Sequence, residues 1–494
     1  KYYEQRKDLI YTGRTLFGAP CPKGQELEDH YFGTIKTRVQ EFMTDLNKEL
    51  WKLGILAKTE HNEVAPAQHE LAPIFTTTNI ATDHNQLTME LIQRVAKKHG
   101  LVALLHEKPF EGINGSGKHN NWSLSTDTGL NLLEPGDTPH ENAQFLVFLA
   151  AIIKAVDEHQ DLLRLSVATA GNDHRLGANE APPAIISIFL GDELTAVLQA
   201  IEEDKPYDGK EKELMKIGAT VLPKFPKDST DRNRTSPFAF TGNKFEFRMP
   251  GSNSSIAGCN IVLNAVIADE LQKFADILES ADDFETTLHT LIKDTIKNHK
   301  RIIFNGNGYD DSWIEEAEKR GLFNLKTTPD ALPYFKTDEN IDLFERQKVL
   351  SKEEVESRYE ILMDEYEKQI NIEALTMLDI AKKDILPAAS KFSKELTDTI
   401  ANKKAIGIDL IYELETAKKV SEYLTEAYQA MMTLENDVKK LHEIDDFEKS
   451  AFYVRDFIIQ DMALLRKPCD ELEVITSNSD WPFPTYGKLL FGIQ

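Results

Sequence analysis

The stretch that decides how this chain is interpreted is Glu60-His61-Asn62-Glu63-Val64-Ala65-Pro66-Ala67-Gln68-His69-Glu70. If Pro66-Ala67 is the tip of a tight turn, the two arms form a hairpin in which Glu63 faces Glu70. Like charges directly opposite each other destabilise a sheet, so this pairing predicts a shared proton or a cation bound by both carboxylates. Carboxylates at one point suit Mg²⁺ or Mn²⁺. A solvated hairpin is the alternative, and a wider loop would shift the register, because Pro-Ala is not a preferred hairpin turn.

A second polar segment, residues 114–124, reads Asn-Gly-Ser-Gly-Lys-His-Asn-Asn-Trp-Ser-Leu. Its glycines let the backbone approach a ligand closely, and the residues after them alternate as in a strand. That alternation places His119, Asn121 and Ser123 on one face. The segment lacks the spacing of a phosphate-binding loop. His119 is therefore either a structural histidine or a metal ligand.

The third segment, Lys-Phe-Glu-Phe-Arg-Met-Pro at residues 244–250, alternates without exception. Its phenylalanines and methionine are predicted to face a core, which leaves Lys244, Glu246 and Arg248 on the other face. That face is either exposed to solvent or lines a polar cavity. In a cavity, the carboxylate would suit a metal and the cations a phosphorylated or carboxylated ligand. Arg234 lies in a turn-like stretch just upstream.

Together, the acidic pair, the histidine strand and the Glu/Arg strand are what a divalent-metal phosphoryl-transfer site on a β-sheet needs. A long, polar, glycine-containing loop at residues 172–183 is interpreted as a candidate lid over such a site.

The organisation of the chain changes near residue 260, from a mixture of short strands and helices to long helices. Separate groups of strands and helices predict an α+β fold. Helices are predicted at 36–53, 83–98 and 144–165, and strands at 72–76, 119–125, 184–190 and 244–249. The later helices are predicted at 260–301, 351–385, 388–403, 408–442 and 446–466. Their apolar stripes indicate a helical bundle, with a subunit interface as the alternative.

The composition excludes several classes of protein. Among 494 residues, 57 Lys+Arg against 82 Asp+Glu leave a net charge of −25, which argues against a nucleic-acid binder because phosphate neutralisation needs clustered cations. The three cysteines form neither a disulfide framework nor a zinc pattern. No apolar run is long enough to cross a membrane. We therefore expect a soluble, cytoplasmic protein with no nucleic-acid or membrane partner.

The combination of motifs resembles the signatures of glutamine synthetase, in the same order along the chain. Four stretches carry the resemblance: residues 63–70, 114–119, 233–236 and 245–248. Residues 12–19, 106–110 and 481–484 look like the long type III branch of that family. The resemblance implies an α+β catalytic domain over residues 1–260, with a mostly antiparallel curved sheet and flanking helices. It also implies a helical C-terminal region over residues 261–494, partly packed on the catalytic domain and used in assembly.

The resemblance further implies a role for each matching residue. The metal ligands would be Glu63 and Glu70 for one ion, and His119 and Glu246 for a second. The residues that would bind glutamate are Asn114, Gly115, Arg175 and Arg248. The residues that would contact the nucleotide are Asn121, Ser123 and Arg234. The catalytic group would be Arg234, Arg248 and Glu180, the last as a flap acid that closes the site and helps to deprotonate ammonium.

The implied reaction is the phosphorylation of the γ-carboxylate of L-glutamate by ATP, followed by attack of ammonia on γ-glutamyl phosphate. The implied cofactor is Mg²⁺ or Mn²⁺, with ATP as a co-substrate. Metal ions and arginines would offset the charge on the transferring phosphoryl group, and a carboxylate base would take a proton from ammonium. Because the family builds each site between neighbouring subunits, the resemblance implies a homo-oligomer of stacked hexameric rings, a dodecamer.

Two positions depart from the family's pattern. Ala239 stands about where commoner branches have a second phosphate-contacting arginine. Lys244 stands where they have another, and a lysine cannot form the same bidentate contact. The family also has a small β-rich domain, two further metal glutamates and an aspartate before the region where this chain starts. We therefore expect the sequence to be most of a longer polypeptide.

Two other functions fit the same resemblance. A γ-glutamyl amine or polyamine ligase would use another amine in place of ammonia, and the nucleophile pocket would distinguish it. A non-catalytic relative would keep the ring assembly as a scaffold. The joint presence of Glu63, Glu70, His119, Glu246 and Arg248 argues against a scaffold, which has no need of opposed buried charges.

Overall fold

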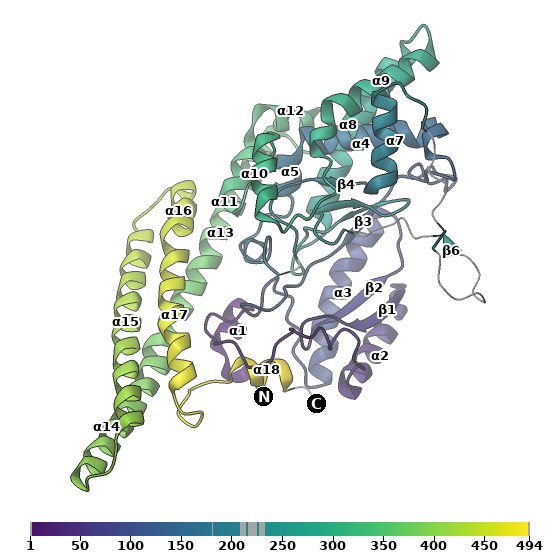
Figure 1. The fold of residues 1–494 in the computed structure, drawn as a ribbon. Helices are drawn as coiled ribbons and strands as arrows, with labels where there is room; N and C mark the ends of the chain where they lie inside the picture. The colour runs from purple at the N-terminus through teal and green to yellow at the C-terminus, as the bar shows by residue number, and fades with distance from the viewer. Residues whose placement is uncertain (1, 180, 208–213, 216–224, 227–232, 493–494) are drawn as a thin grey trace. The chain divides into compact units, whose positions relative to one another are not determined.

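The computed structural model describes residues 2–179, 181–207, 214–215, 225–226 and 233–492 (Figure 1). The chain divides into two compact units. Unit 1 comprises Lys1–Ser116, Thr169–His174 and Ser357–Gln494, and unit 2 comprises Gly117–Ala168 and Arg175–Glu356. The predicted boundary near residue 260 lies inside unit 2, so these units do not follow it. The division into a catalytic domain and a helical region stays a prediction.

One part of unit 1 consists of two helices and a hairpin. They are α2 (Thr37–Lys52), α3 (Thr78–Lys98), β1 (Ala57–Asn62) and β2 (His69–Pro73), and the two strands are antiparallel. Apolar side chains of both helices pack around Ile55, which is fully buried. Helix α2 matches its prediction. Helix α3 starts five residues before the predicted Asp83. Its first turn contains Ile80, but that side chain is exposed, and the first buried residue of the helix is Thr88, so no apolar stripe marks the beginning.

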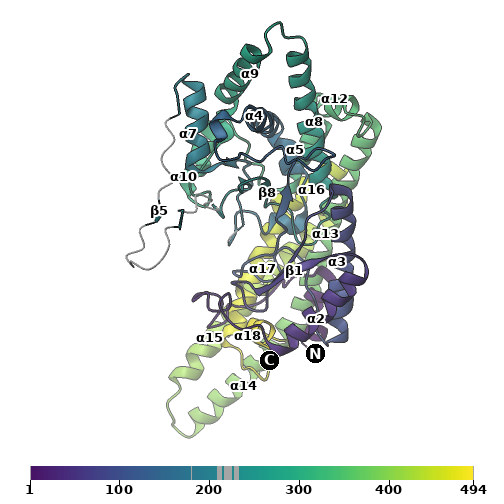
Figure 2. The ribbon, with the colours of Figure 1, turned by 90° about the vertical axis from the view of Figure 1, so that its right-hand side faces the viewer.

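A helical bundle makes up most of the rest of unit 1. Its helices are most of α13 (Lys352–Ile380), α14 (Leu386–Ala405), α15 (Ile411–Leu441), α16 (Phe447–Tyr453) and α17 (Ile459–Ile475). Helix α15 lies against both α14 and α17 (Figures 1 and 2). Most residues of the predicted apolar stripes face inward, as the burial of Tyr359, Ile370, Val420 and Leu434 shows, whereas Leu414, at the beginning of the α15 stripe, is 43% exposed. The predicted bundle is therefore confirmed.

Two π-helical turns interrupt these long helices. They are η5 (Ala381–Ile385), between α13 and α14, and η6 (Val454–Ile458), between α16 and α17. Pro387 lies two residues after the end of η5, in the first turn of α14. Proline has no amide hydrogen, and its ring clashes with the carbonyl four residues earlier in a regular helix, so a wider turn accommodates it.

The C-terminal strap, residues 476–492, packs against the beginning of the chain. It contains α18 (Tyr486–Phe491). The guanidinium of Arg6 donates to Pro484 O at 2.9 Å and lies 4.4 Å from the centroid of the Phe483 ring. The ring of Tyr2 lies against Gly492. The first and last described segments of unit 1 are therefore neighbours (Figure 1).

Unit 2 is built on a four-stranded sheet with the order β3-β8-β7-β4. Its strands are β3 (Asn120–Trp122), β8 (Phe245–Phe247), β7 (Phe238–Phe240) and β4 (Ile188–Phe189). Strand β8 is antiparallel to both β3 and β7, and β4 runs parallel to β7. The phenylalanines of β7 and β8 are buried. The strands predicted at 119–125, 184–190 and 244–249 are present but shorter than predicted, and β7 was not predicted. The strand predicted at 72–76 corresponds to β2, which lies three residues earlier.

Helices pack around one another in unit 2. The longer ones are α4 (Ala143–Glu158), α7 (Gly191–Glu202), α8 (Ala257–Glu279), α9 (Phe284–His299), α10 (Asp311–Lys319) and α12 (Asp338–Arg346). Helix α4 lies against both α8 and α9 (Figure 2) and is buried along most of its length. The helix predicted at 260–301 is two helices, α8 and α9, because a polar turn at residues 280–283 separates them.

Short elements complete the two units. They are η1 (Tyr3–Gln5), α1 (Lys7–Thr12), η2 (Pro139–Glu141), α5 (Gln160–Leu165), α6 (Ala170–Asp173), β5 (Leu214–Met215), β6 (Phe225–Pro226), η3 (Lys300–Ile302), α11 (Thr328–Ala331) and η4 (Leu332–Lys336). The α+β class is confirmed. Among the described residues, no helix combines the length and the apolar character that crossing a membrane requires.

Candidate active site

The hairpin of β1 and β2 pairs His61 with Glu70 and Asn62 with His69. The predicted pairing of Glu63 with Glu70 is therefore wrong. A two-residue hairpin turn requires a positive φ at its first central position, and the φ of proline is fixed near −65°. Pro66 cannot serve there. The loop is wider, and Ala67 takes the positive φ, at 60°.

The register differs from the prediction by two residues, which keeps every side chain on its predicted face. Glu63 and Glu70 therefore still share one face of the hairpin, together with His61. One ligand atom from each of these three residues lies within 4.8 Å of the other two. Sequence reasoning missed His61, although its position two residues before Glu63 on a predicted strand was the signal.

His61 is held between a carbonyl and a carboxylate. Its Nδ1 lies 2.8 Å from Asn62 O, and its Nε2 contacts Glu70 Oε2. The hydrogen bond with Asn62 and the charges of Glu70 and Glu63 raise the pKa of His61 above its ordinary value. The Glu70 side chain is 44% exposed. Two carboxylates and an imidazole on an open face fit a divalent cation, so the residues present suit the implied metal.

The predicted glutamate-binding loop lies beside this hairpin in unit 1. Gln68, between the two glutamates in sequence, donates its Nε2 to Gly115 O at 2.8 Å and to Ser116 Oγ at 2.9 Å. Gln25 holds Asn114 from another side, with its Nε2 2.5 Å from Asn114 Oδ1 and its Oε1 2.9 Å from Asn114 N. The structure therefore brings together Glu63, Glu70, Asn114 and Gly115 from the predicted site.

The second predicted metal pair lies on the sheet of unit 2. His119 Nδ1 is 2.8 Å from Glu246 Oε1, and Arg248 donates to Glu246 Oε2 at 2.9 Å. The Glu246 side chain is only 7% exposed, so this face of β8 is not solvated. Burial alone would raise the pKa of Glu246, but hydrogen bonds and charges from His119 and Arg248 outweigh it and hold the pKa at about 2.

Arg248 also fixes the turn that carries Arg234. Its guanidinium donates to Asn233 O, and Asn233 in turn donates to Gly306 O at 2.7 Å. The hydroxyl of Thr235 accepts a hydrogen bond from Gly308 N at 2.7 Å. The turn is therefore anchored on both sides, while the Arg234 side chain is exposed. This arrangement suits an arginine that meets a ligand from solution.

Arg175, predicted to hold a substrate carboxylate, is buried and braces the end of β8. It donates to Met249 O at 3.0 Å and to Arg248 O at 3.0 Å. A Cβ at Gly117 would lie 2.0 Å from its Nη2, so a larger residue there would displace the guanidinium from these carbonyls. Its role toward the substrate stays a prediction. Glu180 lies outside the described residues.

The predicted nucleotide contacts Asn121 and Ser123 are exposed on the same face as His119, in agreement with the predicted alternation. Ser123 Oγ donates to Asn131 Oδ1 at 2.8 Å. Their role toward a nucleotide stays a prediction. Ala239 is fully buried opposite Glu246, so no side chain reaches a phosphate from that position.

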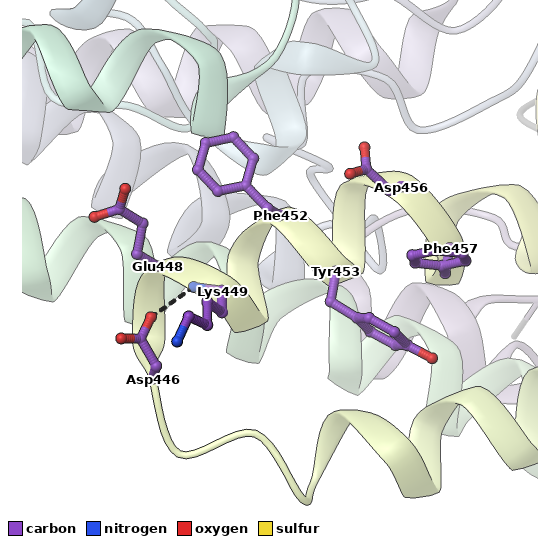
Figure 3. Close-up of a pocket in the computed structure, with 7 residues that line it drawn as sticks. All are labelled: Asp446, Glu448, Lys449, Phe452, Tyr453, Asp456 and Phe457. Atoms are coloured by element: carbon purple, nitrogen blue, oxygen red, sulfur yellow. Dashed lines mark hydrogen bonds between the residues drawn. The ribbon is translucent and has the colours of Figure 1, made fainter.

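A separate hollow of about 400 Å³ lies on α16 and η6 (Figure 3). None of the predicted site residues lines it. Its lining residues are Asp446, Glu448, Lys449, Phe452, Tyr453, Asp456 and Phe457.

Comparisons with known proteins agree with these motifs. The glutamine synthetase catalytic domain matches residues 12–187, and the glutamine synthetase C-terminal domain matches residues 287–404. A glutamine synthetase of Butyrivibrio fibrisolvens is 52% identical over 100% of this chain and 71% of its own length. The type-3 glutamine synthetase of Dictyostelium discoideum is 47% identical over 99% of this chain and 68% of its own length. The latter agrees with the type III resemblance.

A solved structure of GmaS without ligand matches 71% of this chain and 62% of its own, with a TM-score of 0.42 and 16% sequence identity. The relatives from Butyrivibrio and Dictyostelium are far more similar, and each matches essentially the whole chain. With the motifs in the same order and the two domain matches, these similarities show that the chain belongs to the glutamine synthetase family.

Proposed function

We propose that this chain carries part of the active site of a glutamate–ammonia ligase. ATP would phosphorylate the γ-carboxylate of L-glutamate, and ammonia would displace phosphate from γ-glutamyl phosphate to give glutamine, ADP and phosphate. Family membership supports this reaction. The observation that carries it is the hairpin group of His61, Glu63 and Glu70, joined through Gln68 to the loop of Asn114 and Gly115.

Mg²⁺ or Mn²⁺ would be held by Glu63 and Glu70, with His61 beside them, and a second ion by His119 and Glu246. When bound, such ions supply positive charge that offsets the charge on phosphate oxygens. Because both oxygens of Glu246 already have partners, that carboxylate is ionised and aligned before any ligand arrives. It needs no protonation change to take up a cation.

The arginines would bind the negatively charged groups of the substrates. Arg234, exposed on an anchored turn, would contact ATP phosphates, and Arg248 would stabilise the transferred phosphoryl group beside glutamate. Arg175 would hold a carboxylate of glutamate or the backbone that binds it. Asn121 and Ser123 would contact the nucleotide. Glu180 would accept a proton from ammonium, because only the neutral amine has a lone pair for the attack.

We further propose that the complete protein is a cytoplasmic homo-oligomer, a dodecamer of stacked hexameric rings. Residues 1–260 would form its catalytic domain and residues 261–494 a helical region used in assembly. The family membership supports the assembly. The acidic composition and the free state of all three cysteines agree with a reducing compartment and with no nucleic-acid partner.

The test uses the full-length polypeptide with L-glutamate, ATP, Mg²⁺ and ammonium. Glutamine and phosphate should appear in equal amounts, and Glu63→Gln should abolish both. Glu60→Gln is the matched control, because Glu60 lies on the same strand but on the opposite face from Glu63 and accepts a hydrogen bond from Asn47. The control should keep its activity. Product formation only with another amine would overturn the proposal in favour of an amine ligase.

A further inference from the structure

The hydroxyl of Tyr486, the first residue of α18, joins several parts of unit 1. The Tyr486 residue is 1% exposed. Its oxygen lies 2.7 Å from Thr15 Oγ1, 2.8 Å from Arg466 Nη2 and 3.1 Å from the backbone nitrogen of Glu111. These partners belong to the N-terminal segment, to α17 and to the loop that leads to Asn114. The C-terminal strap therefore contacts the segment that leads into the predicted glutamate-binding loop.

The direction of each hydrogen bond follows from the number of available protons. Thr15 donates its single hydroxyl hydrogen to Pro109 O at 2.8 Å. Tyr486 must then donate to Thr15 Oγ1, and its oxygen accepts from Arg466 and from the amide of Glu111. A phenolic hydroxyl has one donor and two acceptor sites, so all its capacity is used. No other rotation of the hydroxyl satisfies every partner.

The ring of Tyr486 is held as tightly as its hydroxyl. It meets the ring of Phe110 edge-on, with the centroids 5.4 Å apart and the planes at 84°. On the other side it lies over Gly18, where an added Cβ would be 2.2 Å from ring atom Cε1. Gly18 has a φ of 149°, which L side chains rarely adopt. Tyr486 of the strap therefore contacts Phe110 through its ring and Glu111 through a hydrogen bond.

Glu111 lies close in sequence to Asn114 and Gly115, the residues that would bind glutamate. Only two residues separate Glu111 from Asn114, and the short segment between them is closed by a hydrogen bond from Lys108 Nζ to Ile113 O at 2.6 Å. Beyond it, Gln25 and Gln68 hold Asn114 and Gly115. The segment from Glu111 to Asn114 is therefore short and hydrogen-bonded on both sides, which couples the position of Glu111 to that of Asn114.

We propose that Tyr486 is a positioning residue for the glutamate-binding loop, so that the C-terminal strap sets the affinity for L-glutamate without touching it. This inference rests on the proposed function, in which Asn114 and Gly115 bind glutamate. Removing the hydroxyl takes away one anchor of the loop and leaves the amide of Glu111 without that acceptor. The free energy that orders the loop must then come from substrate binding, which weakens the affinity for L-glutamate.

The test compares Tyr486→Phe with Tyr359→Phe in the full-length enzyme. Tyr359 is also buried in unit 1, and its hydroxyl donates to Glu448 at 2.7 Å, but this contact joins α13 to α16 and lies away from the loop of Asn114. In Tyr486→Phe, we expect KM for glutamate to rise about tenfold, with kcat and KM for ATP within about twofold of the wild type. In Tyr359→Phe, all three parameters should stay within about twofold. An unchanged KM for glutamate in Tyr486→Phe, or an equal rise in the control, would overturn the proposal.

A second measurement separates this proposal from the proposed function. Amide hydrogen exchange of residues 109–116 should accelerate about tenfold in Tyr486→Phe and in Thr15→Val, but not in Tyr359→Phe. Thr15→Val keeps the shape of the side chain and removes only the hydroxyl. A wild-type protein that makes no glutamine contradicts the proposed function. Unchanged exchange in the loop contradicts the positioning role, whatever the wild-type activity.

Discussion

The two predicted metal-binding groups of this chain use the same residue types in opposite physical settings. On the hairpin of unit 1, Glu63 and Glu70 lie beside His61 on an open face. On the sheet of unit 2, Glu246 is buried, and both of its oxygens are bound by His119 and Arg248. The hairpin gathers carboxylates that a cation would hold together. The sheet neutralises its carboxylate before any cation is present.

This difference indicates that replacing a binding residue destabilises the fold strongly if the residue is buried and only slightly if it is exposed. A buried ion pair is expensive to break, because the remaining charge stays in a low-dielectric interior. An exposed group of acids contributes little to stability, because water screens it. Variants of the two groups should therefore separate into those that unfold the protein and those that only remove a ligand.

The largest effect is expected for Glu246→Ala. Arg248 would lose its carboxylate partner while remaining buried, so the free energy of unfolding should fall by about 3 to 5 kcal/mol. Urea denaturation of the purified variant measures this. A loss below about 1 kcal/mol would show that Arg248 finds another partner and that the pair contributes no stability.

Glu473, a buried carboxyl of the helical bundle, has a raised pKa, whereas the pKa of Glu246 is lowered. Burial and the neighbouring Asp470 raise the pKa of Glu473 from 4.5 to about 7, although Arg6 and the amide of Ala19 act against the shift. The folded state therefore binds a proton more tightly than the unfolded state, and stability falls as pH rises from 4.5 through 7. Above pH 7, Glu473→Gln should be more stable than the wild type by roughly 2 to 3 kcal/mol.

Below pH 4.5 the same two proteins should be equally stable, because Glu473 is then protonated in both states. Thermal unfolding across this pH range measures the difference. Glu471→Gln, an exposed position on the same helix, is the matched control and should follow the wild type at every pH. A difference between wild type and Glu473→Gln that does not grow with pH would contradict the raised pKa.

A smaller energetic effect is expected for Glu70→Gln on the hairpin. The affinity of this variant for Mn²⁺ should fall by at least about tenfold, which corresponds to about 1.4 kcal/mol. Its free energy of unfolding should change by less than about 1 kcal/mol. Electron paramagnetic resonance of free Mn²⁺ measures the binding directly. Unfolding of this variant as severe as that of Glu246→Ala would break the distinction between the two groups.

The smallest effect on stability is expected for Arg234→Ala. The side chain is exposed, and the turn beneath it is held by Asn233 and Thr235, so the free energy of unfolding should change by less than about 0.5 kcal/mol. KM for ATP should rise. An unchanged KM for ATP would remove Arg234 from the nucleotide site.

The sequence predicted the elements well because their signals are local. The apolar stripes of α13 and α15 and the alternation in β8 place side chains on the correct faces. The hairpin register failed because it depends on a turn geometry that proline excludes at one position. The side chains were nevertheless assigned to the correct faces, because the register differed from the prediction by an even number of residues.

The contacts between distant segments were not predictable from local pattern. The burial of Glu246 and the bracing role of Arg175 depend on which strands and loops meet in three dimensions. His61 could have been found, because it lies on the same strand face as Glu63. Tyr486 could not, because its partners Thr15 and Glu111 are hundreds of residues away in the chain.

That separation has a consequence for synthesis. Thr15 and Tyr486 are 471 residues apart, so their contact forms only after translation has passed α18. Non-local contacts of this kind form late in folding. A nascent chain on the ribosome, or one ended early by a nonsense codon, would hold the loop of Asn114 without its final anchor. On the proposed role of Tyr486, substrate affinity would report that translation has passed α18.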